Sequence, residues 1–421
     1  MKKIVIAGTG YVGLVTAVCL AEKGNDVTCV DVDEKKIETL RQNISPIYEE
    51  GLEELMIKNQ ERLVYTVDYA KAYSYADVVF IGVGTPEQED GTANLSYVRS
   101  VAKQIAENIT KDCVIVVKST VPIGTNDEVE EYIKANLKNK VGVSIASNPE
   151  FLAQGSAVRD TLHAKRIILG VEDEFAEKTL TDLYRNFEIP MVVTNRRSAE
   201  MTKYASNDFL ALKISYINEI ANLCELVGAN IDDVVKGMSL DPRIGDKFLN
   251  AGIGYGGSCF PKDTKALFHM AQNKYGYEMK TIKAAIDVNY TQKTKLFYEG
   301  RKLIGRYDGV NVTVLGLTFK PNTDDLREAP SLDMINLLEK DGAIIHAYDP
   351  VGMKNFRKIN STVNLYDNIQ DAIAKSEMIF VLTEWPEIAN ANYDNKVVLD
   401  GRNCVKNKDK IKKYISIGNH K

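Results

Sequence analysis

The sequence predicts an α/β protein with two doubly wound parallel sheets and a long helical segment between them. Short apolar runs alternate with helix-like stretches over residues 1 to about 195, and the same alternation returns from about residue 305. The stretch from residue 198 to residue 227 contains neither glycine nor proline. Apolar runs with β-favouring residues on both faces are typical of parallel strands that helices cover on both sides.

The composition is that of an ordinary globular protein, with 421 residues, 44% hydrophobic, 26% charged and a net charge of −5. A nucleic-acid partner would require a basic excess, so none is expected. The cysteines have no paired spacing, and we expect reduced thiols in a cytoplasmic protein. No C-x-x-C or H-E-x-x-H occurs, so no metal site is expected. The apolar run after Lys2 and Lys3 is too short for a signal peptide or a membrane span.

The first sheet is predicted from five apolar runs, at residues 4–7, 27–30, 78–81, 114–117 and 143–146. The first run leads into a G-x-G-x-x-G motif that opens an apolar helix over residues 14–21 and is formed by Gly8, Thr9, Gly10, Tyr11, Val12 and Gly13. Asp31 lies 18 residues beyond Gly13, close to the ~20 expected for a carboxylate that binds a ribose. The alternative is an ordinary strand–helix turn with a coincidental acid. We interpret the stretch as a Rossmann dinucleotide site that prefers NAD, because Asp31 would repel the 2′-phosphate of NADP.

Three further loops follow strand ends in this half of the chain. They span residues 84–86, 118–122 and 148–152 and include Thr85, Thr120 and Glu150. Each by itself would be a surface turn rich in helix and strand breakers. Ligands bind at the carboxyl ends of parallel strands, so we expect the three loops to surround one crevice.

The long helix is predicted over residues 198–227, with Ser198 as N-cap, Glu200 in the first turn and Gly228 as the C-terminal stop. Lys203 and Asn207 are four residues apart and share a face that is otherwise apolar. They are either a functional pair or two solvated residues at the edge of the buried stripe. A helix of about 30 residues spans roughly 45 Å, which predicts that it bridges two domains or packs against another subunit.

The stretch GYGGSCFPKD, residues 254–263, places Cys259 between a glycine-rich bend and a predicted helix start at Pro261. A helix N-terminus and a nearby lysine, here Lys262, favour the reactive thiolate. Asp263 is a candidate base or orienting carboxylate. The alternative is a buried structural cysteine beside a tight turn.

Residues 229–295 are predicted to be helical apart from this loop, and residues 293–306 to form a charged connecting helix. The second sheet is predicted from strands at residues 312–315, 344–348, 378–382 and 397–400. Its first loop lacks a full G-x-G-x-x-G, so no second dinucleotide is expected. Arg243, Arg327 and Arg402 lie in polar turns and would suit anion contacts; solvated residues or surface ion pairs are the alternatives.

These motifs together resemble the nucleotide-sugar 6-dehydrogenases of the UDP-glucose/GDP-mannose dehydrogenase family over nearly the whole chain. The shared segments are GTGYVGL, SPIYEEGL, KSTVPIGT, NPEFL, residues 199–225, GYGGSCFPKD, GLTFKPNTDDLREAP and DGRN. The resemblance implies oxidation of UDP-glucose to UDP-glucuronate by two successive NAD⁺, a product that would suit polysaccharide synthesis. It also implies a homodimer and three parts: an NAD-binding Rossmann domain (1–195), a central helical dimerisation segment with the cysteine loop (196–300) and a Rossmann-like UDP-sugar-binding domain (301–421).

By resemblance, Cys259 captures the C6 aldehyde as a thiohemiacetal, which is oxidised to a thioester and hydrolysed. Lys203 and Asn207 stabilise the developing oxyanion, Asp263 and Thr120 position the water, and Glu150 aids hydrolysis. The implied NAD contacts are Gly8, Gly10, Tyr11, Val12, Gly13, Asp31, Lys36, Thr85, Thr120, Lys262 and Arg327. The implied substrate contacts are Glu150, Phe151, Leu152, Lys203, Asn207, Arg243 (across the dimer interface), Phe248, Leu249, Gly256, Phe319, Lys320 and Arg402. Gln154 stands where family members commonly carry an acid, and Tyr255 replaces a frequent phenylalanine.

Three other functions remain open on the sequence. The same chemistry would serve another nucleotide sugar, such as GDP-mannose or UDP-N-acetylmannosamine. A two-electron hydroxyacid dehydrogenase shares the Rossmann domain and central helix but has no use for Cys259. A non-catalytic sensor of NAD and a sugar nucleotide would not require Cys259, Lys203, Asn207 and Asp263 together.

Overall fold

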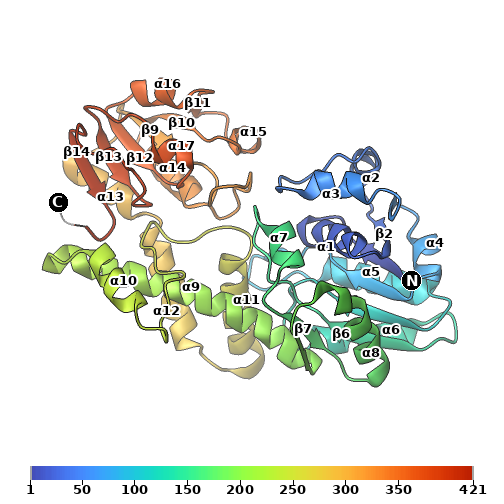
Figure 1. The fold of residues 1–421 in the computed structure, drawn as a ribbon. Helices are drawn as coiled ribbons and strands as arrows, with labels where there is room; N and C mark the ends of the chain where they lie inside the picture. The colour runs from blue at the N-terminus through green and yellow to red at the C-terminus, as the bar shows by residue number, and fades with distance from the viewer. Residues whose placement is uncertain (1, 420–421) are drawn as a thin grey trace. The chain divides into compact units, whose positions relative to one another are not determined.

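The computed structural model describes residues 2–419. They divide into two compact units, one that ends at Ser206 and one that begins at Asn207 (Figure 1). Within the described residues, no helix combines the length and the apolar character needed to cross a membrane.

The first unit contains an eight-stranded sheet in which β6 and β7 are antiparallel and all other neighbours are parallel. In spatial order the strands are β3 (Leu63–Thr66), β2 (Asp26–Val30), β1 (Lys3–Ala7), β4 (Val78–Ile81), β5 (Cys113–Val117), β6 (Val143–Ser147), β7 (Ile167–Gly170) and β8 (Met191–Thr194). The five predicted strands are confirmed. The sequence did not reveal β3, β7 and β8. β3 and β8 are the sheet edges, and their residues are only partly buried. β7 is a fully buried apolar run, so its local signal is present in the sequence although it was not predicted.

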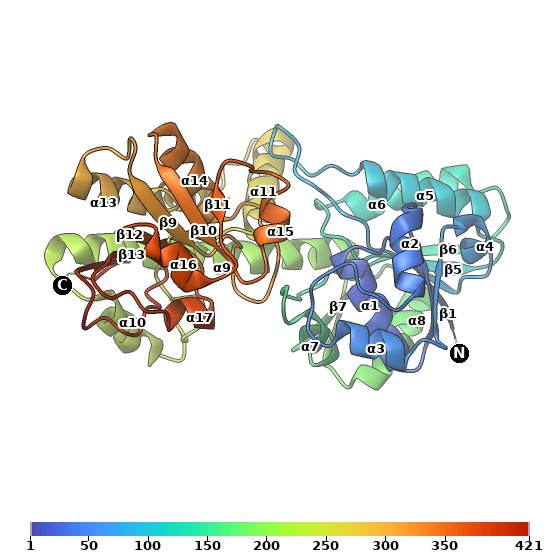
Figure 2. The same cartoon turned by 90° about the horizontal axis from the view of Figure 1, so that it is seen from above.

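Helices cover both faces of this sheet (Figure 2). They are α1 (Tyr11–Glu22), α2 (Glu34–Arg41), α3 (Leu52–Lys58), α4 (Tyr69–Ser74), α5 (Ser96–Asn108), α6 (Thr125–Asn136), α7 (Ala157–Leu162) and α8 (Glu174–Tyr184). Alternate residues of β1 enter two different apolar clusters. Ile4 and Ile6 pack with α1, α3 and α8, whereas Val5 and Ala7 pack with α5 and α6. This alternation is the period of two of a strand buried on both faces.

The long helix, α9 (Arg196–Val227), has 32 residues, which corresponds to about 48 Å. It begins two residues earlier than predicted. The Asn195 Oδ1 accepts a 2.8 Å hydrogen bond from the Ser198 amide, so Asn195 and not Ser198 provides the N-terminal cap. Glu200 therefore lies in the second turn, not in the first. The predicted stop is confirmed, because Gly228 adopts a left-handed φ of 74°.

The second unit contains a six-stranded sheet in which every neighbouring pair is parallel. Its strands, in spatial order, are β11 (Asn364–Leu365), β10 (Ile344–Tyr348), β9 (Asn311–Leu315), β12 (Met378–Val381), β13 (Val397–Asp400) and β14 (Lys413–Ser416). The four predicted strands are confirmed, and the two additional strands, β11 and β14, are again the edges.

The remaining helices are α10 (Ile231–Ser239), α11 (Phe260–Tyr275), α12 (Lys280–Gln292), α13 (Lys295–Ile304), α14 (Pro330–Lys340), α15 (Met353–Phe356), α16 (Ile369–Ala374) and α17 (Pro386–Ala389). The predicted connecting helix is α13. The later turns of α9 contribute Ile217, Ala221 and Cys224 to the same apolar cluster as the strands of the second sheet. This part of α9 is thus integral to the core of the second unit.

Candidate active site

The glycine loop after β1 has the shape of a dinucleotide site. A Cβ at Gly13 would lie 1.9 Å from the Gly8 carbonyl oxygen, so only glycine permits α1 to start this close to the strand. A Cβ at Gly10 would meet no heavy atom within 4 Å, which leaves open space above the loop. Because α1 begins at Tyr11, its first amides face that space. The loop therefore fits the pyrophosphate of NAD.

Asp31 follows the end of β2 beside this loop. Its carboxylate accepts hydrogen bonds from the Thr9 amide (2.8 Å) and hydroxyl (2.6 Å), and it lies 3.1 Å from the Lys36 ammonium. Burial opposes ionisation of Asp31, but the Thr9 bonds, the Asp33 amide and the Lys36 charge outweigh it, so the pKa of Asp31 lies below its ordinary value. An ionised acceptor at this place suits a ribose hydroxyl.

The three strand-end loops, which were predicted to surround one crevice, are hydrogen-bonded to one another. The Thr85 hydroxyl donates to the Thr120 carbonyl oxygen at 2.8 Å, which joins the loops after β4 and β5. The Lys118 ammonium donates to Asn148 Oδ1 at 3.0 Å, which joins the loops after β5 and β6. The loops thus form one edge of the sheet.

Lys203 and Glu150 form a buried ion pair within the first unit. The Lys203 Nζ lies 3.1 Å from both carboxylate oxygens of Glu150, and both side chains are almost fully buried. The Phe151 ring lies beneath two cations, with the Arg166 guanidinium 4.2 Å and the Lys203 Nζ 5.4 Å from its centroid. Removing one partner of such a buried pair strongly destabilises the folded protein, because the other charge stays buried without its counter-charge.

A small cavity of about 50 Å³ borders Glu150. Its lining includes Lys118, Asn148 and Glu150, and its volume is sufficient for a few water molecules. Burial lowers the pKa of Lys118 to about 8, with Lys203 acting in the same direction and Glu150 against it. The sequence analysis did not single out Lys118, although it occurs in the KSTVPIGT segment.

In the second unit, Asn207 and Asp263 are hydrogen-bonded. The Asn207 Nδ2 donates to Asp263 Oδ2 at 2.7 Å, and the Lys262 ammonium lies 2.5 Å from Asp263 Oδ1. The adjacent Asp208 was not predicted to matter. It is buried, neither of its carboxylate oxygens has a hydrogen-bond partner among residues 2–419, and burial followed by the charge of Asp263 raises its pKa to about 8.

Cys259 occupies the N-cap position of α11, directly before Phe260. Its carbonyl oxygen accepts the first helical hydrogen bond, from the Asp263 amide at 2.8 Å, and Pro261 lies in the first turn as predicted. Of the six cysteines, which are all free, Cys259 is the exposed one. Burial raises the pKa values of Cys19, Cys29 and Cys113 to about 12, so those thiols stay protonated and unreactive. The alternative of a buried structural cysteine is therefore wrong for Cys259.

The glycine bend before Cys259 packs against the loop after β9. A Cβ at Gly256 would lie 2.2 Å from the Glu328 carbonyl oxygen, so this close approach requires glycine. The Arg402 guanidinium donates to the carbonyl oxygens of Gly254 (3.2 Å) and Phe319 (3.1 Å), and pairs with Glu384. Arg402 thus joins three loops of the second unit.

The other predicted contacts of the second unit differ in exposure. Phe248 adopts a left-handed φ of 63° and packs edge-on against Phe260, while Leu249 is buried. Such a conformation is strained for a bulky residue and is typical of functional loops.

Two of the arginines that were predicted to contact anions form ion pairs within their own turns. Arg243 pairs with Asp241 and Arg327 with Asp325. The ion pair given as the alternative for Arg327 is thus present, and Arg243, for which the alternative was a solvated turn residue, is paired as well.

Glu49 is a buried residue that sequence reasoning overlooked, although it lies in the SPIYEEGL segment. Its carboxylate accepts from the amides of Gly155 (2.7 Å) and Ala157 (2.6 Å) and from the hydroxyl of Tyr11. It connects the dinucleotide loop with the segment that follows residues 148–152. A buried acid beside an exposed acid of the same type, here Glu50, cannot be recognised from local pattern alone.

Models of the UDP-glucose/GDP-mannose dehydrogenase family match the chain in three parts. The NAD binding domain matches residues 2–188, the central domain residues 197–291 and the UDP binding domain residues 313–407.

Individual relatives match over nearly the full length. The chain is 48% identical over 411 residues to UDP-glucose 6-dehydrogenase YwqF of Bacillus subtilis (strain 168), an alignment that covers 95% of this chain and 93% of the relative. It is 44% identical over 439 residues to UDP-glucose 6-dehydrogenase of Rhizobium meliloti (strain 1021), with 99% of both chains covered. The solved structure of a UDP-glucose dehydrogenase from Pyrobaculum islandicum superposes with a TM-score of 0.97 at 38% identity and covers 100% of this chain and 98% of its own.

Proposed function

The chain belongs to the UDP-glucose/GDP-mannose dehydrogenase family, and we propose that it is a UDP-glucose 6-dehydrogenase. It oxidises UDP-glucose, with two NAD⁺ and one water, to UDP-glucuronate, two NADH and three protons. The glycine loop after β1 would hold NAD, which would supply the hydride acceptor for both oxidations at C6. The observation that carries this proposal is the exposed Cys259 at the N-terminus of α11, in the same unit as the bonded Asn207 and Asp263.

The role of Cys259 is to retain the aldehyde between the two oxidations. Its thiolate adds to the C6 aldehyde, forming a C–S bond and a thiohemiacetal whose oxygen takes up a proton. The second oxidation converts the thiohemiacetal to a thioester. Water then attacks the thioester carbonyl, the C–S bond breaks, and the carboxylate and the cysteine sulfur are released. A simple alcohol oxidation would need only a base, so the cysteine favours four-electron chemistry over a hydroxyacid dehydrogenase.

The polar groups of α9 and the neighbouring loops serve the charged intermediates. Lys203 and Asn207 stabilise negative charge on the C6 oxygen, since both present N–H donors from one face of α9. Asp263 and Thr120 position the attacking water, and Glu150, paired to Lys203, assists hydrolysis.

The remaining predicted contacts complete the proposal as binding residues. For NAD they are Gly8, Gly10, Tyr11, Val12, Gly13, Asp31, Lys36, Thr85, Lys262 and Arg327. For the sugar nucleotide they are Phe151, Leu152, Phe248, Leu249, Gly256, Phe319, Lys320, Arg402 and, from a second subunit, Arg243. Residues 1–195 act as the NAD-binding domain, 196–300 as the central segment and 301–421 as the UDP-sugar-binding domain.

A homodimer through α9 forms part of the proposal. Phe209, Tyr216 and Leu223 recur every seven residues and are 61%, 47% and 52% exposed. Such a stripe of large apolar side chains along one helix face is typical of a protein interface. Arg243, which is exposed on the turn after α10, would reach a partner's substrate from there.

We place the enzyme in the cytoplasm, since its six cysteines are free thiols that suit a reducing compartment. We propose UDP-glucose as the substrate, and not another nucleotide sugar, because the relatives described above at 38–48% identity are UDP-glucose dehydrogenases by name.

The decisive experiment measures NADH formed per UDP-glucose consumed, in the wild type and in Cys259→Ser. We expect about two NADH per sugar in the wild type, and a variant in which product release stalls because an ester or free aldehyde replaces the thioester. GDP-mannose and UDP-N-acetylmannosamine serve as competing substrates in the same assay. One NADH per sugar, unchanged by the substitution, would show that Cys259 takes no part in the reaction and would refute the proposal.

A further inference from the structure

The loop that carries Thr120 ends at a helix that cannot cap itself. Helix α6 begins at Thr125 after Gly124, which adopts a left-handed φ of 97° and has no side chain to accept the first amides. The free amides of a helix N-terminus need an acceptor when they are buried, and Asn126 is fully buried.

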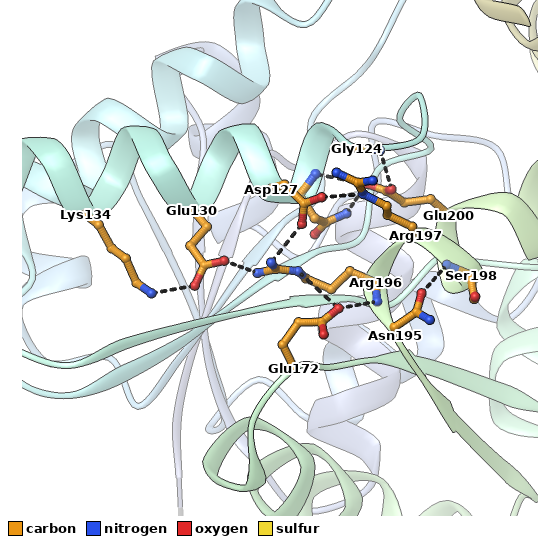
Figure 3. Close-up of polar contacts among 11 residues, drawn as sticks. Gly124, Asp127, Glu130, Lys134, Glu172, Asn195, Arg196, Arg197, Ser198 and Glu200 are labelled. Atoms are coloured by element: carbon orange, nitrogen blue, oxygen red, sulfur yellow. Dashed lines mark hydrogen bonds and ion pairs between the residues drawn. The ribbon is translucent and has the colours of Figure 1, made fainter. Parts of the chain in front are cut away.

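Glu200 of α9 supplies that acceptor from 76 residues away (Figure 3). One carboxylate oxygen accepts from the Gly124 amide at 2.7 Å, and the other accepts from the Asn126 amide at 2.9 Å and from its side chain at 2.6 Å. Glu200 is only 2% exposed. Its three acceptor bonds fix both the position and the orientation of the N-terminus of α6.

Glu200 lies three residues before Lys203 on the same buried face of α9. Gly124, whose amide donates to the Glu200 carboxylate, lies four residues after Thr120 in the chain. The carbonyl oxygen of Thr120 is itself held by the Thr85 hydroxyl at 2.8 Å. One carboxylate therefore connects the loop of Thr120 to the turn of Lys203.

A second set of contacts joins the same two helices farther from the loop (Figure 3). The Arg196 guanidinium lies 2.8 Å from Asp127 and 2.6 Å from Glu130 of α6. Each of these carboxylates also pairs with a second cation. Arg197 lies 2.7 Å from Asp127, and Lys134 lies 2.6 Å from Glu130. Arg196 thus strengthens the contact between α6 and α9 without touching the loop.

We propose that Glu200 is a positioning residue for the hydrolytic step: it holds the Thr120 loop at a fixed distance from Lys203. The inference rests on the proposed function, in which Thr120 orients the water that cleaves the Cys259 thioester. If the carboxylate is lost, the loop shifts, the water is misplaced and the thioester accumulates. Misplacement by about 1 Å is sufficient to slow a step by about 10²-fold.

The test compares Glu200→Gln with Arg196→Met. Glutamine has the size of glutamate, but its amide nitrogen cannot accept a backbone N–H, so one of the two amide bonds is lost. In rapid-mixing experiments with UDP-glucose and NAD, we expect Glu200→Gln to show a burst of about two NADH per subunit, followed by turnover about 10²-fold slower than in the wild type. Mass spectrometry of the quenched enzyme should find the sugar on Cys259. Arg196→Met should lower the melting temperature but retain the wild-type time course.

Hydrogen exchange provides a readout that does not depend on turnover. The amides of Gly124 and Asn126 should exchange faster in Glu200→Gln and remain protected in Arg196→Met. Equal slowing of turnover in both variants without a burst, or wild-type behaviour of Glu200→Gln, would overturn the inference and leave the proposed function intact. Absence of NADH from the wild-type enzyme would instead refute the proposed function and, with it, the hydrolytic role of Glu200.

Discussion

The Asn207 side-chain amide donates a 2.7 Å hydrogen bond to the carboxylate of Asp263, and both residues are buried. The bond fixes which end of the Asn207 amide faces Asp263 and keeps the carboxylate oriented. The Lys262 ammonium also lies 2.5 Å from Asp263, so this one carboxylate accepts from two side-chain donors. Lys262 and Asp263 lie in the first turn of α11, directly after Cys259.

Replacing Asp263 by Asn is expected to lower kcat by 10²-fold or more, because an amide cannot act as a base for water. The new side-chain amide would also offer Asn207 only one acceptor oxygen in place of two, so the orientation of Asn207 would be less well fixed. The KM for UDP-glucose should change much less. Steady-state kinetics of Asp263→Asn checks this, with Lys265→Met as the control, since Lys265 is a cation of the same helix that pairs with Glu328 and has no part in the proposed function. If Asp263→Asn retains most of its kcat, the carboxylate merely holds Asn207 in place.

The Lys203–Glu150 pair should behave as a coupled unit. Lys203→Met leaves the Glu150 carboxylate buried without its cation, and a loss of about 3–5 kcal/mol in the free energy of unfolding is expected. Glu150→Gln together with Lys203→Met should restore much of that stability while activity remains low. Chemical denaturation of the two single variants and the double variant gives the coupling energy. Additive losses would show that the two charges do not interact in solution.

Asp208 should make stability depend on pH. Its pKa is raised to about 8 in the folded protein and is near 4 in the unfolded chain. The folded state therefore binds more protons between these values, so the contribution of Asp208 to stability is complete below about pH 4 and is lost as the pH rises toward 8. Asp208→Asn cannot ionise, and its stability relative to the wild type should increase by up to about 1.4 kcal/mol per pH unit in this range.

Urea unfolding of wild type and Asp208→Asn at pH 5, 6, 7 and 8 measures this trend. Asp246→Asn is the matched control, since Asp246 is exposed and pairs with Lys247 at 3.3 Å. A stability difference between Asp208→Asn and the wild type that stays constant over this range would mean that Asp208 ionises normally within the fold.

The apolar stripe of α9 predicts the oligomeric state. Phe209→Glu combined with Leu223→Glu places two charges where the proposed interface excludes water, and we expect the dimer to dissociate to monomer in sedimentation or light-scattering measurements. Val64→Glu, at an exposed apolar residue of the edge strand β3, should leave the mass unchanged. A monomeric wild-type protein would remove the basis for Arg243 as a contact from a second subunit.

Much of the fold was predictable because its signals are local. The central strands of both sheets are continuous buried runs, the glycine motif sits directly between β1 and α1, and Pro261 lies in the first turn of α11 as predicted. The edge strands β3 and β8 are harder to predict, since an edge strand needs only one apolar face. The interior strand β7 was missed although its residues are apolar and fully buried. The cap of α9 was also placed wrongly, because Asn195 and Ser198 are both good caps by residue type.

The sequence by itself predicted the residues of the proposed site, since Cys259, Asp263, Lys203 and Asn207 occur in short segments whose chemistry and family likeness are visible without coordinates. Only the tertiary structure decided their partners. Glu200 bonds to Gly124 across 76 residues, Lys203 to Glu150 across 53 and Asn207 to Asp263 across 56. The pattern of apolar and polar residues along a chain indicates the period of a single helix or strand, but not which elements contact one another. Which buried charge meets which donor depends on how separate elements pack, and that packing also leaves the Asp208 carboxylate without a hydrogen-bond partner in the described part of the chain.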